Sequence, residues 1–121
     1  MESAMMTELR SALEAERDRL TAEIEEYERA GQETLSDVSG ENNYRDHMAD
    51  QGSATFAREL DMTLEGQARD SLAQIERALA RMEAGTYGTC ARCAAAIPEG
   101  RLEAMPEADL CVGCKEREES V

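Results

Sequence analysis

Apolar residues recur along the first part of the chain at the spacing of an amphipathic helix. From Glu8 to Arg29 there is no Gly or Pro, and Glu, Arg, Ala and Leu dominate. The apolar positions form a seven-residue repeat with intermediate steps of three or four: Met6, Leu9, Leu13, Leu20, Ile24 and Tyr27. Glu16 and Arg17 interrupt the stripe. We predict one helical arm over about residues 4–30, with a narrow apolar face.

A second stripe with steps of three or four runs through residues 54–84. Its members are Phe56, Leu60, Leu64, Ala68, Leu72, Ile75, Leu79 and Met82. Ser53 precedes the run at the position of an N-cap, and Gly85 follows it at the position of a C′ glycine. Gly66 weakens the middle of this helix by about 1 kcal/mol relative to Ala. The pattern predicts a second arm whose stripe belongs to the core.

Residues 31–53 are rich in Gly, Ser and Asn, which favours a turn region between the arms. Neither arm can bury its stripe alone. We therefore predict a mostly α fold, in which residues 1–84 form an antiparallel helical hairpin, or coiled coil, with its tip at 31–53. Residues 85–121 follow as a small module that ends in a short C-terminal helix and tail.

Composition limits the classes of function. The chain has 121 residues, 3% aromatic residues, no Trp and a formal net charge of −14, with a pI near 4.4. So few aromatic residues suit a narrow helical seam better than a large core. The negative charge argues against direct binding to nucleic acid, which depends on Lys and Arg at phosphates. It favours a protein partner with a basic surface.

The chain starts with MESAMMTELR, which has neither the basic nor the apolar region of a signal peptide. No stretch approaches the roughly 20 apolar residues of a membrane span. A cytoplasmic location is the expectation, with no membrane partner. In a reducing cytosol, cysteines hold metals more often than they form disulfides.

All four cysteines lie in two Cys-x2-Cys pairs that are separated by 17 residues: Cys90, Cys93, Cys111 and Cys114. Two such pairs supply four thiolates for a closed tetrahedral site, so one structural Zn2+ is predicted. The alternatives are two disulfides, an iron centre or a dithiol redox pair, and the spacing by itself does not separate zinc from iron. The module has too little apolar bulk to fold without the metal.

The residues around the cysteines resemble the C4 zinc-finger signature of the DksA/TraR family. The similarity covers about residues 42–115 and rests on Tyr87-Gly-Thr-Cys90-Ala-Arg-Cys93, Ile97-Pro-Glu, Arg101-Leu-Glu-Ala-Met-Pro106 and Leu110-Cys-Val-Gly-Cys114-Lys. Upstream, Phe56-Ala-Arg-Glu-Leu-Asp and the run from Ile75 to Gly85 look like the returning coiled-coil arm of that family.

The resemblance implies a bacterial accessory factor of RNA polymerase that regulates transcription. Family members dock at the secondary channel of the polymerase and direct the coiled-coil tip to its active site. The family's tip pattern Asp-x-x-Asp-x-Ala falls on residues 47–52, where Asp50 matches the second acid and Asp46 lies one position out of register. Some members bind guanosine tetraphosphate through basic residues near the finger. The matching positions here are Gln74, Met105 and Lys115, so dependence on this alarmone is not expected.

Other interpretations stay open at this point. The coiled coil is alternatively a protein-interaction or dimerisation module that a structural zinc finger stabilises, and the sequence does not separate monomer from dimer. Asp46 and Asp50 are alternatively ordinary solvated acids, and His47 an exposed turn residue. The basic residues near the finger alternate with acids, which indicates a mixed surface: Arg92, Arg101, Lys115 and Arg117. An enzyme is not predicted, because no nucleophile with a base, phosphate loop or open metal site is found.

Overall fold

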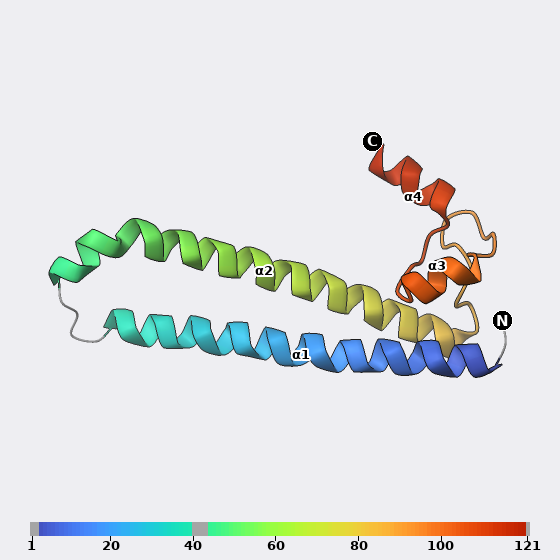
Figure 1. The fold of residues 1–121 in the computed structure, drawn as a ribbon, viewed down its shortest axis with the longest axis horizontal. Coiled ribbons are helices and arrows are strands. Elements are labelled where there is room, and N and C mark those ends of the chain that lie inside the picture. The colour runs from blue at the N-terminus through green and yellow to red at the C-terminus, as the bar shows by residue number, and fades with distance from the viewer. Residues whose placement is uncertain (1–2, 40–43, 121) are drawn as a thin grey trace. The chain divides into compact units, whose positions relative to one another are not determined.

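The structure, a computed structural model, describes residues 3–39 and 44–120, with side chains described for 3–32 and 55–120. These residues form α1 (Ser3–Ser39), α2 (Tyr44–Ala84), α3 (Glu99–Ala104) and α4 (Val112–Glu119) (Figure 1). The described ranges contain no strand beyond an isolated antiparallel bridge between Thr89 and Ala96. The prediction of a mostly α protein that ends in a short helix is confirmed, while α3 was not predicted.

The chain divides into two compact units, and both long helices contribute to each. The first unit contains residues 1–18 and 72–121, and the second contains residues 19–71. In the first, Arg10 of α1 forms an ion pair with Glu83 of α2. In the second, Glu28 of α1 pairs with Arg69 of α2. Within each unit the two helices are therefore antiparallel neighbours, which confirms the helical hairpin (Figure 1).

The hairpin core consists of the predicted apolar positions over most of its length. In α1 the buried residues are Leu9, Leu13, Leu20 and Ile24. In α2 they are Ala68, Ile75, Met82 and, not predicted, Ala78, while the predicted Leu72 and Leu79 are half-buried. The interruption at Glu16 and Arg17 is real, since both side chains are half-buried at the place where an apolar residue would continue the stripe. The seam is narrow, as expected for two helices that cover only one face of each other.

Three predicted core residues are exposed, and this is a correction. Along α2 the exposed fraction rises steadily toward lower residue numbers, from 6% at Ala68 to 37% at Leu64, 48% at Leu60 and 68% at Phe56. A step of four residues advances about 40° around a helix, so a strict four-residue spacing turns away from the buried seam. Over the three steps from Ala68 to Phe56 the rotation is about 120°, which carries Phe56 out of the interface between the helices.

The helices also extend further into residues 31–53 than predicted. α1 continues to Ser39 and α2 starts at Tyr44, so Ser53 lies inside a helix and is not an N-cap. Gly and Ser lower helix stability by only about 1 kcal/mol or less per residue, whereas the true helix breaker, proline, first occurs at position 98. Asp46, His47 and Asp50 fall within the bounds of α2, but their side chains lie outside the described residues.

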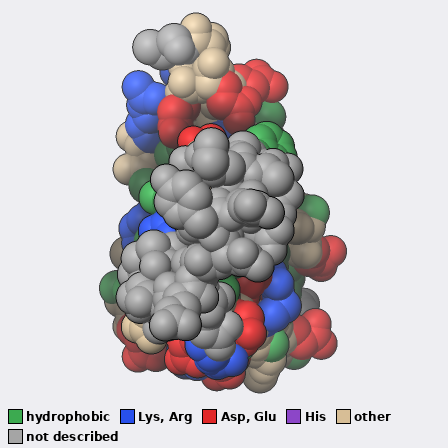
Figure 2. Space-filling view, turned by 90° about the vertical axis from the view of Figure 1, so that its left-hand side faces the viewer, with side chains coloured by type: hydrophobic (Ala, Val, Ile, Leu, Met, Phe, Trp, Pro, Cys, Tyr) green, Lys and Arg blue, Asp and Glu red, His purple; other side chains and the backbone are tan. Residues whose placement is uncertain are grey.

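The outer faces of the long helices carry many charges of both signs. Several arginines pair with a carboxylate one turn away, as in Arg19–Glu23, Arg29–Glu26 and Arg69–Glu65. Figure 2 shows red and blue side chains on the same face, around the grey atoms whose placement is uncertain. Such pairs support the helices by about 0.2–0.5 kcal/mol each. Among the described residues, no helix is long and apolar enough to cross a membrane.

Candidate metal centre

α2 ends in a turn that redirects the chain into the cysteine module. Gly85 has a φ of +77°, in the left-handed region that favours glycine. Its N–H donates to the carbonyl of Met82, and the N–H of Thr86 donates to the carbonyl of Arg81. These two bonds define a Schellman motif, so the prediction of Gly85 as the C′ residue is confirmed.

The first Cys-x2-Cys pair lies in a tight turn between two backbone pairings. The N–H of Cys90 donates to the carbonyl of Ala95, and the N–H of Ile97 donates to the carbonyl of Gly88. Ala94 closes the turn with a φ of +64°, and its N–H donates to the carbonyl of Cys90. The N–H of Cys93 points at Sγ of Cys90, at 3.5 Å from N to S. The turn therefore brings both thiols of the pair to the same side.

The second pair lies at the start of α4. Cys111 is the N-cap residue, with an extended backbone, and Cys114 lies in the first turn of the helix. Free N–H groups and the helix dipole make a helix start a favourable place for thiolates. Pro98 in turn caps α3, whose Leu102 is fully buried and supplies the module's apolar centre.

The four sulfur atoms lie together as the sequence predicts. The ligand atoms of Cys90, Cys93, Cys111 and Cys114 are all within 4.8 Å of one another. The Cys93 and Cys111 sulfurs are 3.7 Å apart, and the cysteines are free, not paired in disulfides. A tetrahedral zinc with Zn–S bonds of about 2.3 Å requires S–S separations of about 3.8 Å. The donor set thus fits one tetrahedral zinc ion.

The surroundings of the thiols favour the thiolate state at some positions and oppose it at others. Backbone N–H groups, first that of Cys93 and then that of Cys111, lower the pKa of Cys90 to about 6. The backbone N–H of Cys114 likewise lowers the pKa of Cys111. Burial raises the pKa of Cys114 to about 12. A divalent cation removes these protons when it binds, because only thiolates act as ligands.

Arg81, in the last turn of α2, attaches the module to the hairpin, and no sequence pattern marks this residue. Its guanidinium donates to the carbonyl oxygens of Thr86, Thr89 and Asp109, which lie on both sides of the first cysteine pair. Its own carbonyl accepts the N–H groups of Thr86 and Tyr87. The end of α2 and the cysteine module are therefore one hydrogen-bonded structure.

Tyr87 provides a second attachment inside the module. Its ring is buried, and its hydroxyl donates to the carbonyl of Pro106 at 2.8 Å. Burial, with a smaller contribution from the charge of Glu107, raises the pKa of Tyr87 to about 12. The hydroxyl therefore stays a donor at neutral pH.

The predicted mixed surface near the finger consists partly of internal contacts. Arg101 donates to the carbonyl of Leu110, and Arg117 donates to the carbonyl of Gly113. A second nitrogen of Arg117 lies 3.8 Å from the Cys114 sulfur. This position lets the guanidinium offset part of the net negative charge of four thiolates around one divalent ion. Lys115 lies 4.0 Å from Glu119, while Arg92 is exposed.

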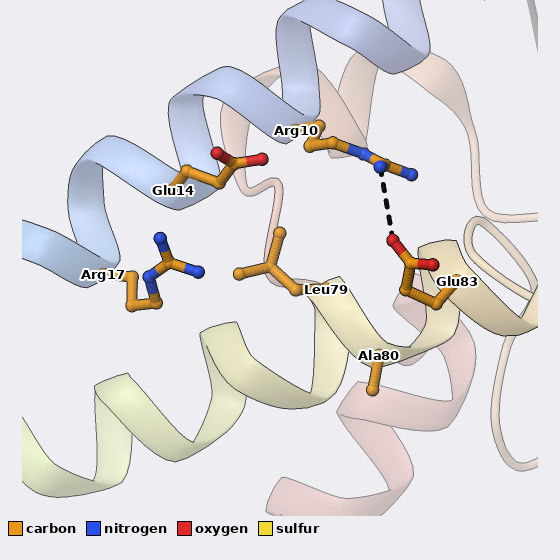
Figure 3. A pocket seen from close by; sticks show the side chains of 6 residues that line it. All are labelled: Arg10, Glu14, Arg17, Leu79, Ala80 and Glu83. Carbon is orange, nitrogen blue, oxygen red and sulfur yellow. Dashed lines mark hydrogen bonds and ion pairs between the residues drawn. The ribbon is translucent and has the colours of Figure 1, made fainter.

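A groove of about 260 Å³ lies between α1 and α2 in the first unit, which also contains the cysteine module. Figure 3 shows Arg10, Glu14 and Arg17 of α1 around Leu79 of α2, and the Arg10–Glu83 ion pair closes one side. The lining contains two arginines and two glutamates. Because these charges balance, the groove has no preference for a cation or an anion.

Together, a helical hairpin and a closed four-cysteine module at its base define the class of helical proteins with a C4 zinc finger. Residues 85–120 match the family described as the prokaryotic dksA/traR C4-type zinc finger. The RNA polymerase-binding transcription factor DksA of Caulobacter vibrioides is 35% identical over 107 residues, which cover 88% of this chain and 75% of that protein. General stress protein 16O of Bacillus subtilis is 39% identical over 82 residues, 66% of this chain. The chain spans half the length of that second relative.

The fold matches as well. The solved structure of transcription factor DksA2 from Pseudomonas aeruginosa superimposes with a TM-score of 0.77 and 29% identity, over 99% of this chain and 87% of that one. The chain therefore belongs to the DksA/TraR family, and its four cysteines form a site for one structural zinc ion.

Proposed function

We infer that this protein is a transcription regulator that binds RNA polymerase at the secondary channel, with the hairpin tip directed to the polymerase active site. The observation that carries this inference is the similarity to the Caulobacter DksA, a protein named for binding RNA polymerase, over 88% of the chain. The match to the fold of DksA2, which is named as a transcription factor, over 99% of the chain supports it. Action on polymerase places the protein in the cytoplasm.

In this proposal the zinc finger is structural and the hairpin tip is the working end. A closed four-cysteine site leaves no coordination position for a substrate or water. The residues that would act at the tip are Asp50, with Asp46 beside it in sequence. They are proposed from the family's tip pattern, since their side chains lie outside the described residues.

The test is the binding of the zinc-loaded chain to core RNA polymerase from its own organism. The wild-type protein and Asp50→Asn are compared for affinity and for the lifetime of the open promoter complex. We expect both to bind, and only the wild type to change the lifetime. If neither binds, the proposal is wrong and the hairpin is an interaction module for another partner.

We also infer that guanosine tetraphosphate is not a ligand of the finger. Arg101, Met105, Val112 and Lys115 line a groove of about 290 Å³ together with Glu116 and Glu119. Arg101 already donates to the carbonyl of Leu110, and Lys115 lies near Glu119. Two engaged cations beside two carboxylates are a poor match for a ligand with four phosphate groups. Calorimetry with the polymerase complex, with and without the alarmone, tests this.

A further inference from the structure

The apolar strip on α2, formed by Phe56, Leu60 and Leu64, has no function in the hairpin itself. These side chains have left the seam with α1 and are exposed to solvent. The part of α2 that carries them is green in Figure 1. Phe56 is the only phenylalanine in the chain. A row of three large exposed apolar side chains on one helix face is typical of a surface for a partner helix.

The charges beside the strip indicate the chemistry of the partner. With about 100° per residue, Glu59 and Asp70 fall at one edge of the strip and Asp61 at the other. The positions between these edges hold neutral residues, among them Gln67 and Ser71. Arg58 and Arg69 lie on the opposite side of the helix, about 160° or more from the middle of the strip.

The electrostatic field at the Asp61 edge is negative. Asp61 and Glu23 contribute, after burial, to the raised pKa of Tyr27 on the neighbouring helix. Arg69 does not offset Asp61, because its guanidinium is engaged with Glu28 and Glu65. An apolar face with acidic edges matches a helix that has an apolar face with Lys or Arg at its edges, as in the flanking ion pairs of coiled coils.

We propose that the apolar strip of α2 docks a basic amphipathic helix of the protein partner, with the partner's apolar side chains on Phe56, Leu60 and Leu64 and its basic side chains at the acidic edges. A second copy of this chain is a poor occupant, since it would bring the same acidic edges together in a protein with a net charge of −14.

The place of the strip on α2 supports contact with the same partner as the tip. A rise of about 1.5 Å per residue puts Phe56 about 9 Å and Leu64 about 21 Å along α2 from the position of Asp50. A partner that encloses the tip must therefore pass close to the strip. In this respect the inference rests on the proposed function, because RNA polymerase is the partner in which the helix is sought.

The experiment compares the affinities of four zinc-loaded proteins for core RNA polymerase: wild type, Phe56→Asp, Leu60→Asp and Met62→Asp. Met62 is the matched control, because it is an apolar residue of the same helix that is 64% exposed. It lies about 160° around the helix from the middle of the strip, at the groove that α2 forms with Tyr27 of α1. Circular dichroism and thermal melts confirm that each variant is folded. We expect Phe56→Asp and Leu60→Asp to weaken binding by about tenfold or more, as for central interface residues. Met62→Asp should bind like the wild type.

Each other outcome has a distinct meaning. If the wild type binds and Leu60→Asp binds equally well, the strip is not a docking surface, although the proposed function stands. If Met62→Asp weakens binding as much as Leu60→Asp, the effect is one of net charge and the inference is also wrong. If the wild type is a dimer in sedimentation and Leu60→Asp is a monomer, the occupant is a second copy. If the wild type fails to bind polymerase, the proposed function fails and the partner named here fails with it.

The basic character of the partner helix has its own readout. Glu59→Gln and Asp61→Asn remove one charge from each edge and leave the apolar contacts in place. We expect weaker binding at low salt and a smaller loss of affinity as salt is raised, because fewer charge pairs are left to be screened. If the salt dependence of binding is unchanged, the partner helix does not place basic side chains at the acidic edges of the strip, and this part of the inference is wrong.

Discussion

Ala94 holds a backbone conformation that residues with a Cβ rarely adopt. Its φ of +64° closes the turn of the first cysteine pair. This φ lies in the left-handed region, which favours glycine. The strain is stored next to a metal ligand and is balanced by the hydrogen bonds of the turn and by the metal. A residue in this position is an opportunity to stabilise the finger by substitution.

We predict that Ala94→Gly stabilises the zinc-loaded finger by about 0.5 kcal/mol. Relief of the left-handed strain, about 1–2 kcal/mol, exceeds the entropy that glycine adds to the unfolded chain, about 0.5–1 kcal/mol. Competition for zinc against a chromophoric chelator measures the change. Ala95→Gly is the control: Ala95 has no positive φ, so only the entropic cost applies and zinc binding should weaken. If Ala94→Gly binds zinc more weakly than the wild type, the backbone of Ala94 is not strained as proposed.

Arg81 is the residue through which the hairpin and the finger become one structure. We predict that Arg81→Met destabilises the zinc-loaded chain by about 2 kcal/mol, because several carbonyls lose a charged donor at once. Urea unfolding followed by the near-ultraviolet signal of the three tyrosines measures it. Arg77→Met, at an exposed position one turn earlier in α2, should change stability by less than about 0.5 kcal/mol. Equal effects of both substitutions would show that Arg81 acts through its helix alone.

At the scale of the element, α2 is a long helix with a weak point in the middle. Gly66 lies inside α2, has no unusual φ, and a Cβ added there would meet nothing within 4 Å. Nothing in the backbone conformation or the surroundings of Gly66 therefore requires a glycine, and alanine would fit there without a clash.

We predict that Gly66→Ala stabilises the hairpin by about 1 kcal/mol, the difference in helix propensity between the two residues. Thermal melting followed by the helical signal at 222 nm measures it. Gly85→Ala provides the opposite case: there is space for a Cβ, but the φ of +77° makes alanine strained, so the melting temperature should fall. If Gly66→Ala also lowers the melting temperature, the glycine has a role that its surroundings do not show.

At the scale of the whole molecule, the zinc ion and the helices contribute to different parts of the fold. The helical residues belong mainly to α1 and α2, with 37 and 41 residues, against 6 and 8 in α3 and α4. The finger is held by its metal and a few buried side chains, chiefly Tyr87, Ile97 and Leu102. Its folding therefore depends on zinc far more than that of the long helices does.

We predict that chelation of zinc unfolds residues 86–114 and leaves most of the helical signal at 222 nm. Hydrogen exchange of the backbone amides should become fast in the finger and change little around Leu20 and Ile24. Added zinc should restore the protection, which separates metal loss from irreversible damage. Protection of the finger that persists without the metal would contradict its dependence on zinc.

The metal site, the helical arms and the Gly85 turn could all be predicted from the amino-acid sequence. Each depends on residues that are close in the chain: a Cys-x2-Cys turn, an apolar step of three or four, a glycine after the last helical residue. Short-range patterns of this kind can be recognised in a sequence because the local backbone alone places their residues relative to one another. The two cysteine pairs are separated by 17 residues, so the site also needs a long-range contact. It could still be predicted, because one tetrahedral zinc ion needs four thiolates and the chain has four cysteines.

Which apolar residues are buried, and which polar residues hold the module together, became clear from the folded structure alone. The stripe of α2 reads as continuous, but its four-residue steps rotate relative to the partner helix, so Phe56, Leu60 and Leu64 end outside the seam. The partners of Arg81 are carbonyls, and every residue of a chain offers one. A sequence therefore cannot mark them, and only the path of the folded backbone brings Thr89 and Asp109 to one guanidinium.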